Sequence, residues 1–405
     1  MGYRCKATKP WLSISGEEVC TAKTEDVKVV LRGATNVWFA DTRSSISIPV
    51  DDISTRRKII GILNEWFDTL NASRTNGQFD RNYINMFAVK NGVNADELYQ
   101  AFVDRANNMM SNEDVNENTS EDEYRLQEYK VLCKTSGSDA MDFHSINYPI
   151  AEYNPIIHKY FKSISLVPKL RETRAFVGFS RLEPNEKTVS ERKKELRLGS
   201  KEDWLPAVEV YGEGIFFQFD GKNLEKWAQQ ESVKKRIDTL NASYHRSKFG
   251  KKTLGDLRPE FVLIHTFAHL VINQLSFDCG YGSSSIRERI YCEKTTNSLG
   301  MYGLLIYTAS GDSEGSLGGL VRQGEMGRLE DTIINAIENA TWCTSDPICI
   351  QSSGQGPESL NLAACHNCAL LPETSCENGN RLLDRGAVVG TLQDTDIGFF
   401  REIRN

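Results

Sequence analysis

The chain has 405 residues, of which 40% are hydrophobic and 25% are charged, and its formal net charge is −7. These values are typical of a globular protein with two or three domains. The negative charge excludes a uniformly basic nucleic-acid coat, but it does not exclude a local basic face. No apolar run reaches the roughly 20 residues that a membrane-spanning helix needs, and no signal peptide is recognisable. We therefore expect a cytoplasmic protein that does not enter the membrane.

The N-terminal part begins with strand-like runs and continues with helical patterns. The first 50 residues contain Cys5 and Cys20 and short apolar runs that are typical of strands. Apolar residues at spacings of three and four then predict amphipathic helices over residues 55–70, 84–90 and 95–110. The acidic stretch 111–123 is expected to form an exposed loop or the start of a helix.

From about residue 163 the pattern changes to strands. Two hairpins are predicted, one from residues 166–170 and 173–179, the other from 207–211 and 214–219 with a turn at Gly212. The segment between them, residues 187–201, is rich in Lys and Arg. It is either a solvated surface or a phosphate-contacting segment. The candidate nucleic-acid contacts in it are Arg192, Lys193, Lys194 and Arg197.

The C-terminal part alternates helix and strand before a group of cysteines. A strongly apolar helix is predicted over residues 258–275, a buried strand over 304–309 and a helix over 329–342. A glycine-rich turn at residues 312–319 lacks the Gly-Lys-Ser/Thr ending of a phosphate-binding loop. No such motif occurs elsewhere, so we expect no nucleotide to bind this chain and no ATP-driven motor activity from it.

Five of the ten cysteines lie within 34 consecutive positions, namely Cys343, Cys349, Cys365, Cys368 and Cys376. Because disulfides are rare in the cytosol, such a cluster indicates a metal site. Cys365 and Cys368 have the two-residue spacing that presents both sulfurs to one zinc ion, and Cys376 is the expected third ligand. The fourth is Cys349 or, alternatively, Cys343. We favour Cys349 because the turn at Asp346-Pro347 directs it back towards the other cysteines.

Residues 360–385 resemble the MrfA-type zinc-binding domain, which occurs at the C-terminus of certain bacterial superfamily 2 helicases and in stand-alone accessory proteins. Further stretches resemble the DrmB accessory proteins of DISARM antiphage systems, namely residues 32–39, 176–181, 265–269, 280–281, 285–291 and 307–319. The resemblance implies a zinc-binding antiphage defence protein that works with a helicase subunit (DrmA-like) and engages DNA. Members of this family usually carry more cysteine pairs near the N-terminus. Cys5 and Cys20 therefore resemble half of a zinc ribbon, and two cysteines alone cannot complete a tetrahedral site.

A rival interpretation is a metal-dependent nuclease built on His265, His269, Glu288, Asp312 and Glu314. The two histidines are four residues apart and share one helix face, but Thr266 stands where a zinc protease has its general base Glu. The favoured interpretation of the histidines is a hydrogen-bonded pair in the core. A third possibility is an interaction scaffold without DNA contact.

The sequence as a whole predicts a mixed α/β fold, with a helical N-terminal part followed by a strand-rich α/β region closed by a C-terminal zinc knuckle. The expected parts are residues 1–50, 51–162, 163–257 and 258–405. The expected function is that of a non-catalytic, zinc-binding accessory subunit of an antiphage defence complex that acts with a superfamily 2 helicase on DNA.

Overall fold

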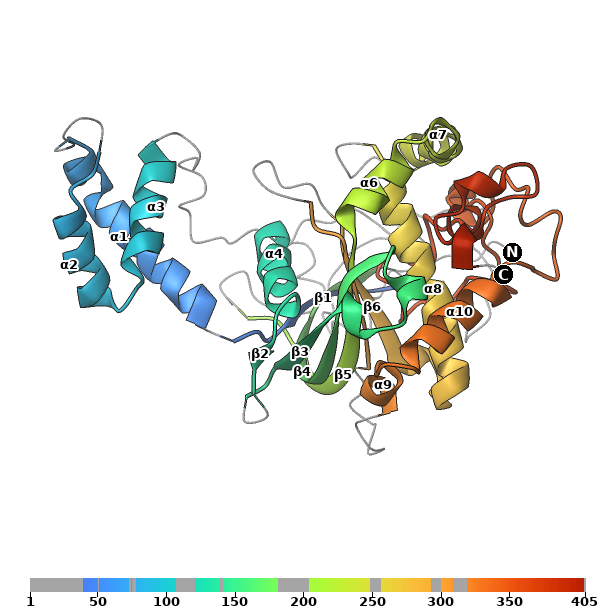
Figure 1. Ribbon diagram of the computed structural model, residues 1–405, viewed down its shortest axis with the longest axis horizontal. Coiled ribbons are helices and arrows are strands. Elements are labelled where there is room, and N and C mark those ends of the chain that lie inside the picture. Colours follow the sequence, from blue (N-terminus) through green and yellow to red (C-terminus); the bar gives the residue numbers. More distant parts are fainter. Residues whose placement is uncertain are drawn as a thin grey trace, which may run out of the picture. The chain divides into compact units, whose positions relative to one another are not determined.

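The structure is a computed structural model that describes residues 39–49, 51–72, 74, 78–106, 121–138, 141–180, 204–247, 256–292, 300–308 and 319–403. The chain divides into two compact units, one of residues 1–46 with 171–210 and the other of residues 47–170 with 211–405. The expected mixed α/β fold is confirmed: helices precede a strand-rich α/β region, and the cysteine cluster follows it (Figure 1).

The α-helices in the described part of the chain are α1 (Asp51–Ala72), α2 (Arg81–Asn91), α3 (Ala95–Ala106), α4 (Glu121–Leu132), α6 (Gly221–Ala228), α7 (Glu231–Arg246), α8 (Pro259–Cys279), α9 (Gly319–Gln323), α10 (Leu329–Asn339) and α11 (Arg385–Val389). The strands are β1 (Phe39–Ile46), β2 (Ser136–Gly137), β3 (His144–Pro149), β4 (Phe161–Ser180), β5 (Ala207–Phe219), β6 (Ile286–Tyr291) and β7 (Gly303–Thr308). Every helix predicted from the apolar spacing is present, as is the buried strand predicted at residues 304–309.

Helices α1, α2 and α3 have a hydrophobic core of their own. The rings of Phe67, Phe79 and Phe102 form its centre, with centroids 5.4–6.1 Å apart. Asp80 caps the start of α2 by accepting from the backbone N–H of Asn82. Gly92 ends the helix at a φ of 61°, a left-handed conformation that suits glycine.

The described strands form one sheet in the order β2-β3-β4-β5-β7-β6, and β1 pairs with β4. The predicted hairpin at residues 166–179 is wrong, because β4 is a single long strand through this region. One half of β4 pairs antiparallel with β3, and the other half pairs antiparallel with β1. Glu172, in the expected turn, is buried and accepts from Arg174 at 2.7 Å, so a polar residue does not mark a turn here.

The second predicted hairpin, at residues 207–219, is also wrong, since β5 continues without a turn. Gly212, which indicated the turn, lies against the neighbouring strand β7. A Cβ at this position would stand 1.6 Å from the carbonyl oxygen of Thr308. The glycine is therefore required by close backbone approach within the sheet rather than by a reversal of the chain.

Helices cover both faces of the sheet, as β6 shows. Successive side chains of a strand point to opposite faces. Glu288 contacts His265 on α8, whereas Arg289 and Tyr291 contact Glu128 on α4. Figure 1 shows α4 and α8 on opposite sides of the strands. This arrangement explains why all six residues of β7 are buried.

The face of the sheet next to α8 carries the main hydrophobic core. Phe267 of α8 lies 5.7–5.8 Å, centroid to centroid, from the rings of Phe161, Phe217 and Phe219, and it stacks on Phe400 at 4.9 Å. The apolar sequence of α8 thus reflects burial on almost all sides. None of the helices in the described ranges is long and apolar enough to cross a membrane.

The opposite face, next to α4, holds a buried charged group. Glu128 accepts from Arg289 Nε at 2.7 Å, from Arg289 Nη2 at 2.9 Å and from the hydroxyl of Tyr291 at 3.0 Å. Beside it, Arg125 forms an ion pair with Glu377 at 2.8 Å. Because Glu377 belongs to the C-terminal cysteine region, this pair links that region to α4.

Candidate metal centre

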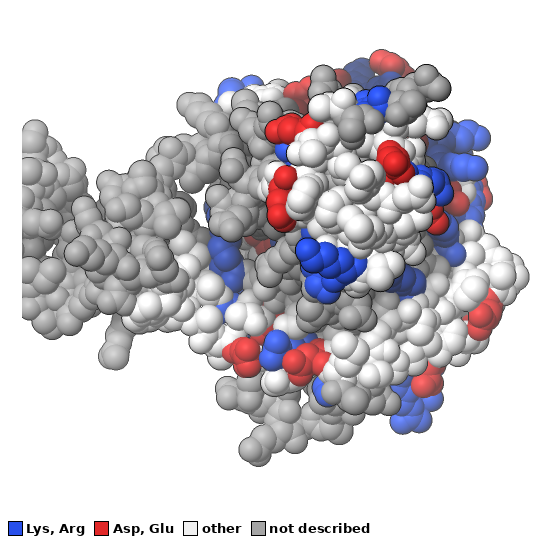
Figure 2. Space-filling model, turned by 90° about the vertical axis from the view of Figure 1, so that its left-hand side faces the viewer, with Lys and Arg blue, Asp and Glu red and all other residues white. Residues whose placement is uncertain are grey.

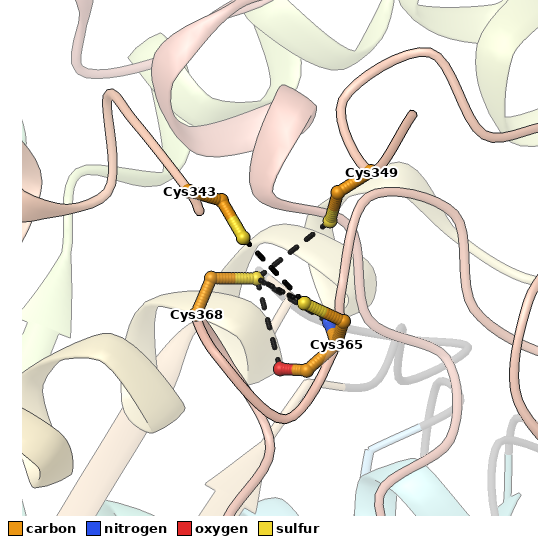
Figure 3. A group of neighbouring side chains, drawn as sticks. All are labelled: Cys343, Cys349, Cys365 and Cys368. Atoms are coloured by element: carbon orange, nitrogen blue, oxygen red, sulfur yellow. Dashed lines mark hydrogen bonds between the residues drawn. The ribbon is translucent and has the colours of Figure 1, made fainter. Parts of the chain in front are cut away.

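Four cysteine sulfurs converge at one point: those of Cys343, Cys349, Cys365 and Cys368 (Figure 3). The sulfur–sulfur distances are 3.5 Å between Cys343 and Cys365, 3.7 Å between Cys365 and Cys368, and 3.8 Å between Cys349 and Cys368. Zn–S bonds of about 2.3 Å in a tetrahedron put the sulfurs about 3.8 Å apart. The residues present therefore fit a tetrahedral zinc ion.

Cys343 and Cys349 lie on one turn after α10. The side chain of Asp346 holds this turn in place. Its carboxylate accepts from the backbone N–H of Cys343 at 2.8 Å and from that of Ile350 at 3.0 Å. Arg385 holds the same carboxylate at 2.6 Å and also donates to the carbonyl oxygen of Ala340 at 2.8 Å. This fixes the turn against the end of the helix, and it directs both thiols of the turn to one side.

Cys365 and Cys368 form a tight turn, the zinc knuckle. The backbone N–H groups of Cys368 and Ala369 donate to the carbonyl oxygen of Cys365 at 3.1 and 3.0 Å. Several N–H groups point at the sulfurs: that of Cys365 at Cys368 Sγ (3.3 Å), that of Ser345 at Cys343 Sγ (3.4 Å) and the Gln355 amide at Cys349 Sγ (3.6 Å). Donors of this kind stabilise negative charge on thiolates, the form in which cysteine binds a metal.

The hydrogen bond between Cys349 and Cys368 shifts the pKa values of the two thiols in opposite directions. The hydrogen bond from Cys368 lowers the pKa of Cys349 from its ordinary value of 9.0 to about 5. The same bond, together with burial, raises the pKa of Cys368. A divalent cation that binds these sulfurs would displace the thiol protons.

The structure groups the expected ligands differently from the sequence-based prediction. Cys349, Cys365 and Cys368 lie together with Cys343, the alternate candidate, whereas Cys376 lies in another group. Cys376 lies within a loop that Asn380 closes by binding both backbone groups of Leu371, at 2.9 and 2.7 Å. Within this loop the sulfur of Cys376 points to His265 on α8.

Cys376 lies in a second group of buried side chains, together with His265, His269 and Glu288. His265 Nε2 is 3.1 Å from Glu288 Oε1 and 3.2 Å from Cys376 Sγ. His269 Nε2 is 3.6 Å from Glu288 Oε2, and its Nδ1 is 2.7 Å from the carbonyl oxygen of Ala369. The two histidines and Glu288 are at most 1% exposed, and Cys376 is 8% exposed. The histidines are thus core-facing, as favoured, but they contact an acid and a thiol as well as the backbone.

Burial and neighbouring charges act in opposite directions on the second group. Burial alone would raise the pKa of Glu288, but the positive charge of the facing His265 and His269 rings in their protonated form lowers it well below its ordinary value. Burial also raises the pKa of the Cys376 thiol, and the nearby charge of Glu288 raises it further. Within the described part of the chain, His265 Nδ1, His269 Nε2 and Glu288 Oε2 have no hydrogen-bond partner. Buried polar atoms without partners cost about 1–3 kcal/mol each.

Several predicted residues lie outside the described residues: Cys5, Cys20, the candidate nucleic-acid contacts Arg192, Lys193, Lys194 and Arg197, and Asp312 and Glu314 of the nuclease hypothesis. On the face drawn in Figure 2, Lys and Arg side chains of the described residues are interspersed with Asp and Glu side chains, without a broad basic surface among them.

Sequence reasoning misses the role of Asp346 and treats it only as part of a turn, although an Asp three residues after Cys343 has the spacing of a side chain that caps a backbone N–H. It also places Cys376 with the other cysteines, whereas the structure places it beside the histidines of α8. The available signal was the pair His265 and His269, whose shared helix face needs polar partners in the core.

Comparison with known proteins agrees with this geometry. The model of the MrfA Zn-binding domain matches residues 267–369, a range that contains the four converging cysteines and ends before Cys376. The chain is also 34% identical to the DISARM protein DrmB of Bacillus paralicheniformis over 417 aligned residues, which cover 98% of this chain and 70% of that protein. The chain therefore carries a zinc-binding domain and belongs to the family of the DISARM protein DrmB.

Proposed function

We propose that this chain is a non-catalytic accessory subunit of a DISARM-like antiphage defence complex, in which it acts in the cytoplasm with a superfamily 2 helicase (DrmA-like) on DNA. The observation that carries this proposal is its similarity to a DISARM protein along almost its whole length. In this proposal, zinc is held by Cys343, Cys349, Cys365 and Cys368 and has a structural role.

The geometry of the cysteine cluster supports a structural role for the metal. Catalytic zinc sites keep one position open for water or substrate, whereas structural sites have four protein ligands. Here four sulfurs already surround one point, and Cys343 and Cys349 are each only 2% exposed. Such a site stabilises a surface loop region and leaves no coordination position for chemistry.

The nuclease alternative needs His265, His269 and Glu288 to bind a metal that a DNA phosphate can reach. All three side chains are buried beneath the C-terminal region, and the thiol of Cys376 occupies the fourth side of the group. A magnesium-dependent nuclease also needs mostly oxygen ligands, whereas this group offers two nitrogens, one carboxylate and one sulfur. These features favour an accessory role over cleavage.

The first prediction tests the accessory role. When the chain is produced together with the superfamily 2 helicase of the same defence system, we expect the two to co-purify and protection against phage to require both. The purified chain alone should leave plasmid and linear DNA intact in Mg²⁺ or Mn²⁺. Metal-dependent cleavage that His269→Ala or Asp312→Ala abolishes would instead support the nuclease.

The second prediction tests the basic segment 187–201, which contains six Lys or Arg residues. Each neutralised phosphate contributes a slope of about −0.9 to log affinity against log salt concentration. Replacing Arg192, Lys193, Lys194 and Arg197 by Ser should therefore reduce the magnitude of the slope by several units in a fluorescence titration with duplex DNA. Co-purification with the helicase should not change.

A matched control removes the same charge elsewhere. Lys222, Lys226, Lys234 and Lys235 are exposed on α6 and α7, and changing all four to Gln should leave the salt slope nearly unchanged. Equal slopes for the wild type and the variant of the basic segment would show that this segment is only a solvated surface. The DNA contacts would then have to come from other parts of the chain or from the partner.

A further inference from the structure

We propose that His265, His269, Glu288 and Cys376 form a second, fully enclosed zinc site, distinct from the four-cysteine site. The two histidines come from α8, the carboxylate from β6 and the sulfur from the loop after the cysteine knuckle. The site goes beyond the proposed function, because it would fasten the C-terminal zinc-binding region to the core of the fold whatever complex the protein joins.

The first observation is that groups with lone pairs face one another. His269 Nδ1 lies 2.7 Å from the carbonyl oxygen of Ala369, which can only accept, so the ring proton is on Nδ1. In the neutral ring, which is the form that binds a metal, His269 Nε2 then carries a lone pair, and it faces Glu288 Oε2 at 3.6 Å. A cation between the ring and the carboxylate would bind both atoms, whereas without a cation the ring pairs with the carboxylate only by taking up a second proton. Neither atom has a hydrogen-bond partner among the described residues.

The second observation concerns His265, whose Nε2 faces two groups at once. It lies 3.1 Å from Glu288 Oε1 and 3.2 Å from Cys376 Sγ. One ring nitrogen has a single in-plane direction, in which it either donates one proton or offers one lone pair. When it donates, the carboxylate and the sulfur have to share its one N–H. Coordination of all three atoms to one ion would give each of them a bond of its own.

The third observation is the environment of the sulfur. Cys376 Sγ accepts from the backbone N–H groups of Asn378 and Asn380, both at 3.3 Å. This turn resembles the arrangement around the sulfurs of the four-cysteine site, where backbone N–H groups also point at sulfur. Donors in this position stabilise a thiolate, which is the metal-binding form of cysteine.

Hydrogen bonds between the proposed ligands and their surroundings also match those of a metal site. A metal-ligating histidine usually donates its second ring N–H to a carbonyl or carboxylate, as His269 does to Ala369. Glu288 Oε1 accepts from the backbone N–H of Glu377 at 3.2 Å, which fixes the carboxylate. Ala369 directly follows Cys368, so this contact connects the two groups of ligands through one residue.

The distances between the proposed ligand atoms suit a zinc ion. For Zn–N bonds of about 2.0–2.1 Å, nitrogen and oxygen ligands in a tetrahedron lie about 3.3–3.4 Å apart. The nitrogen–oxygen distances of 3.1 and 3.6 Å lie around this value. The longer Zn–S bond of about 2.3 Å puts sulfur about 3.5–3.6 Å from a nitrogen ligand, and Cys376 Sγ is 3.2 Å from His265 Nε2. Two imidazoles, one thiolate and one carboxylate form a donor set of borderline softness, which favours zinc over magnesium or calcium. With four protein ligands and almost complete burial, the site is structural.

Elemental analysis of the purified full-length protein tests the proposal. The wild type should contain two zinc equivalents per chain, and Cys376→Ser and the nearly isosteric Glu288→Gln should each contain one. Two controls should retain both equivalents: Cys279→Ser, which lies at the end of the same helix outside the group, and the double variant Cys5→Ser/Cys20→Ser, which excludes a contribution from the N-terminal cysteines.

X-ray absorption at the zinc edge of the wild type provides a measurement that does not depend on whether a variant folds. Two occupied sites should give a mixed first shell, with five sulfur ligands for every three nitrogen or oxygen ligands. A single zinc equivalent per chain with an all-sulfur first shell would overturn the proposal. Two equivalents that both persist in Cys376→Ser and in Glu288→Gln would overturn it as well.

Discussion

Cys365→Ser is expected to abolish zinc binding at the four-cysteine site and to unfold the region around it. The loops that carry these sulfurs have little regular secondary structure, so bonds to one metal ion would hold together segments that no helix or strand fixes. Binding free energies of structural zinc sites are on the order of 10 kcal/mol, and they become folding free energy when the apo site is not formed. Limited proteolysis should therefore cut the variant between residues 340 and 384, where the wild type resists cleavage.

The control for this variant is Cys133→Ser. Cys133 lies just after α4, outside the four-cysteine group and outside the group of His265, His269, Glu288 and Cys376. This variant should keep the zinc content and the proteolysis pattern of the wild type. If Cys365→Ser retained full zinc content and resisted proteolysis, the ion would have to be held by residues other than the four converging cysteines.

The parts of the fold that depend on local pattern were predictable from the sequence. Helix α8 is an apolar run that is buried on nearly all sides, and β7 is a short apolar run that is buried on both faces. The two-residue spacing of Cys365 and Cys368 fixes their geometry within one turn, since neighbouring backbone bonds close the knuckle. In these cases the residues that determine the structure lie within a few positions of one another.

Features that depend on distant contacts were not predictable. Gly212 indicates a turn when it is considered alone, and only the presence of Thr308 on the adjacent strand explains it. The choice between Cys343 and Cys376 has the same origin. Both cysteines are close enough in sequence to reach the knuckle. Asp346 holds Cys343 beside the knuckle, whereas Cys376 contacts His265 on α8. A single sequence does not show which distant elements converge.

The buried charges between α4 and β6 lead to the second large expected effect. Glu128→Gln should destabilise this layer by roughly 3–5 kcal/mol, because it removes the closest carboxylate from the almost fully buried guanidinium of Arg289. The amide can still accept from Tyr291, so the loss reflects charge rather than shape. Hydrogen exchange of the backbone amides of β6 and β7 measures the local free energy of opening. The exposed pair of Arg81 and Asp96 serves as the control.

Arg81→Ala should change stability by less than about 1 kcal/mol, because exposed ion pairs contribute little. The double variant Glu128→Gln/Arg289→Met separates pairing from packing. If the single variant is unstable because a charge is left without its partner in the interior, removal of that charge should restore most of the lost protection. If the double variant is as unstable as the sum of the two single changes, the pair does not act as a unit. The link between α4 and the sheet would then depend on the aromatic packing of Tyr129 and Phe216, whose rings are 5.9 Å apart.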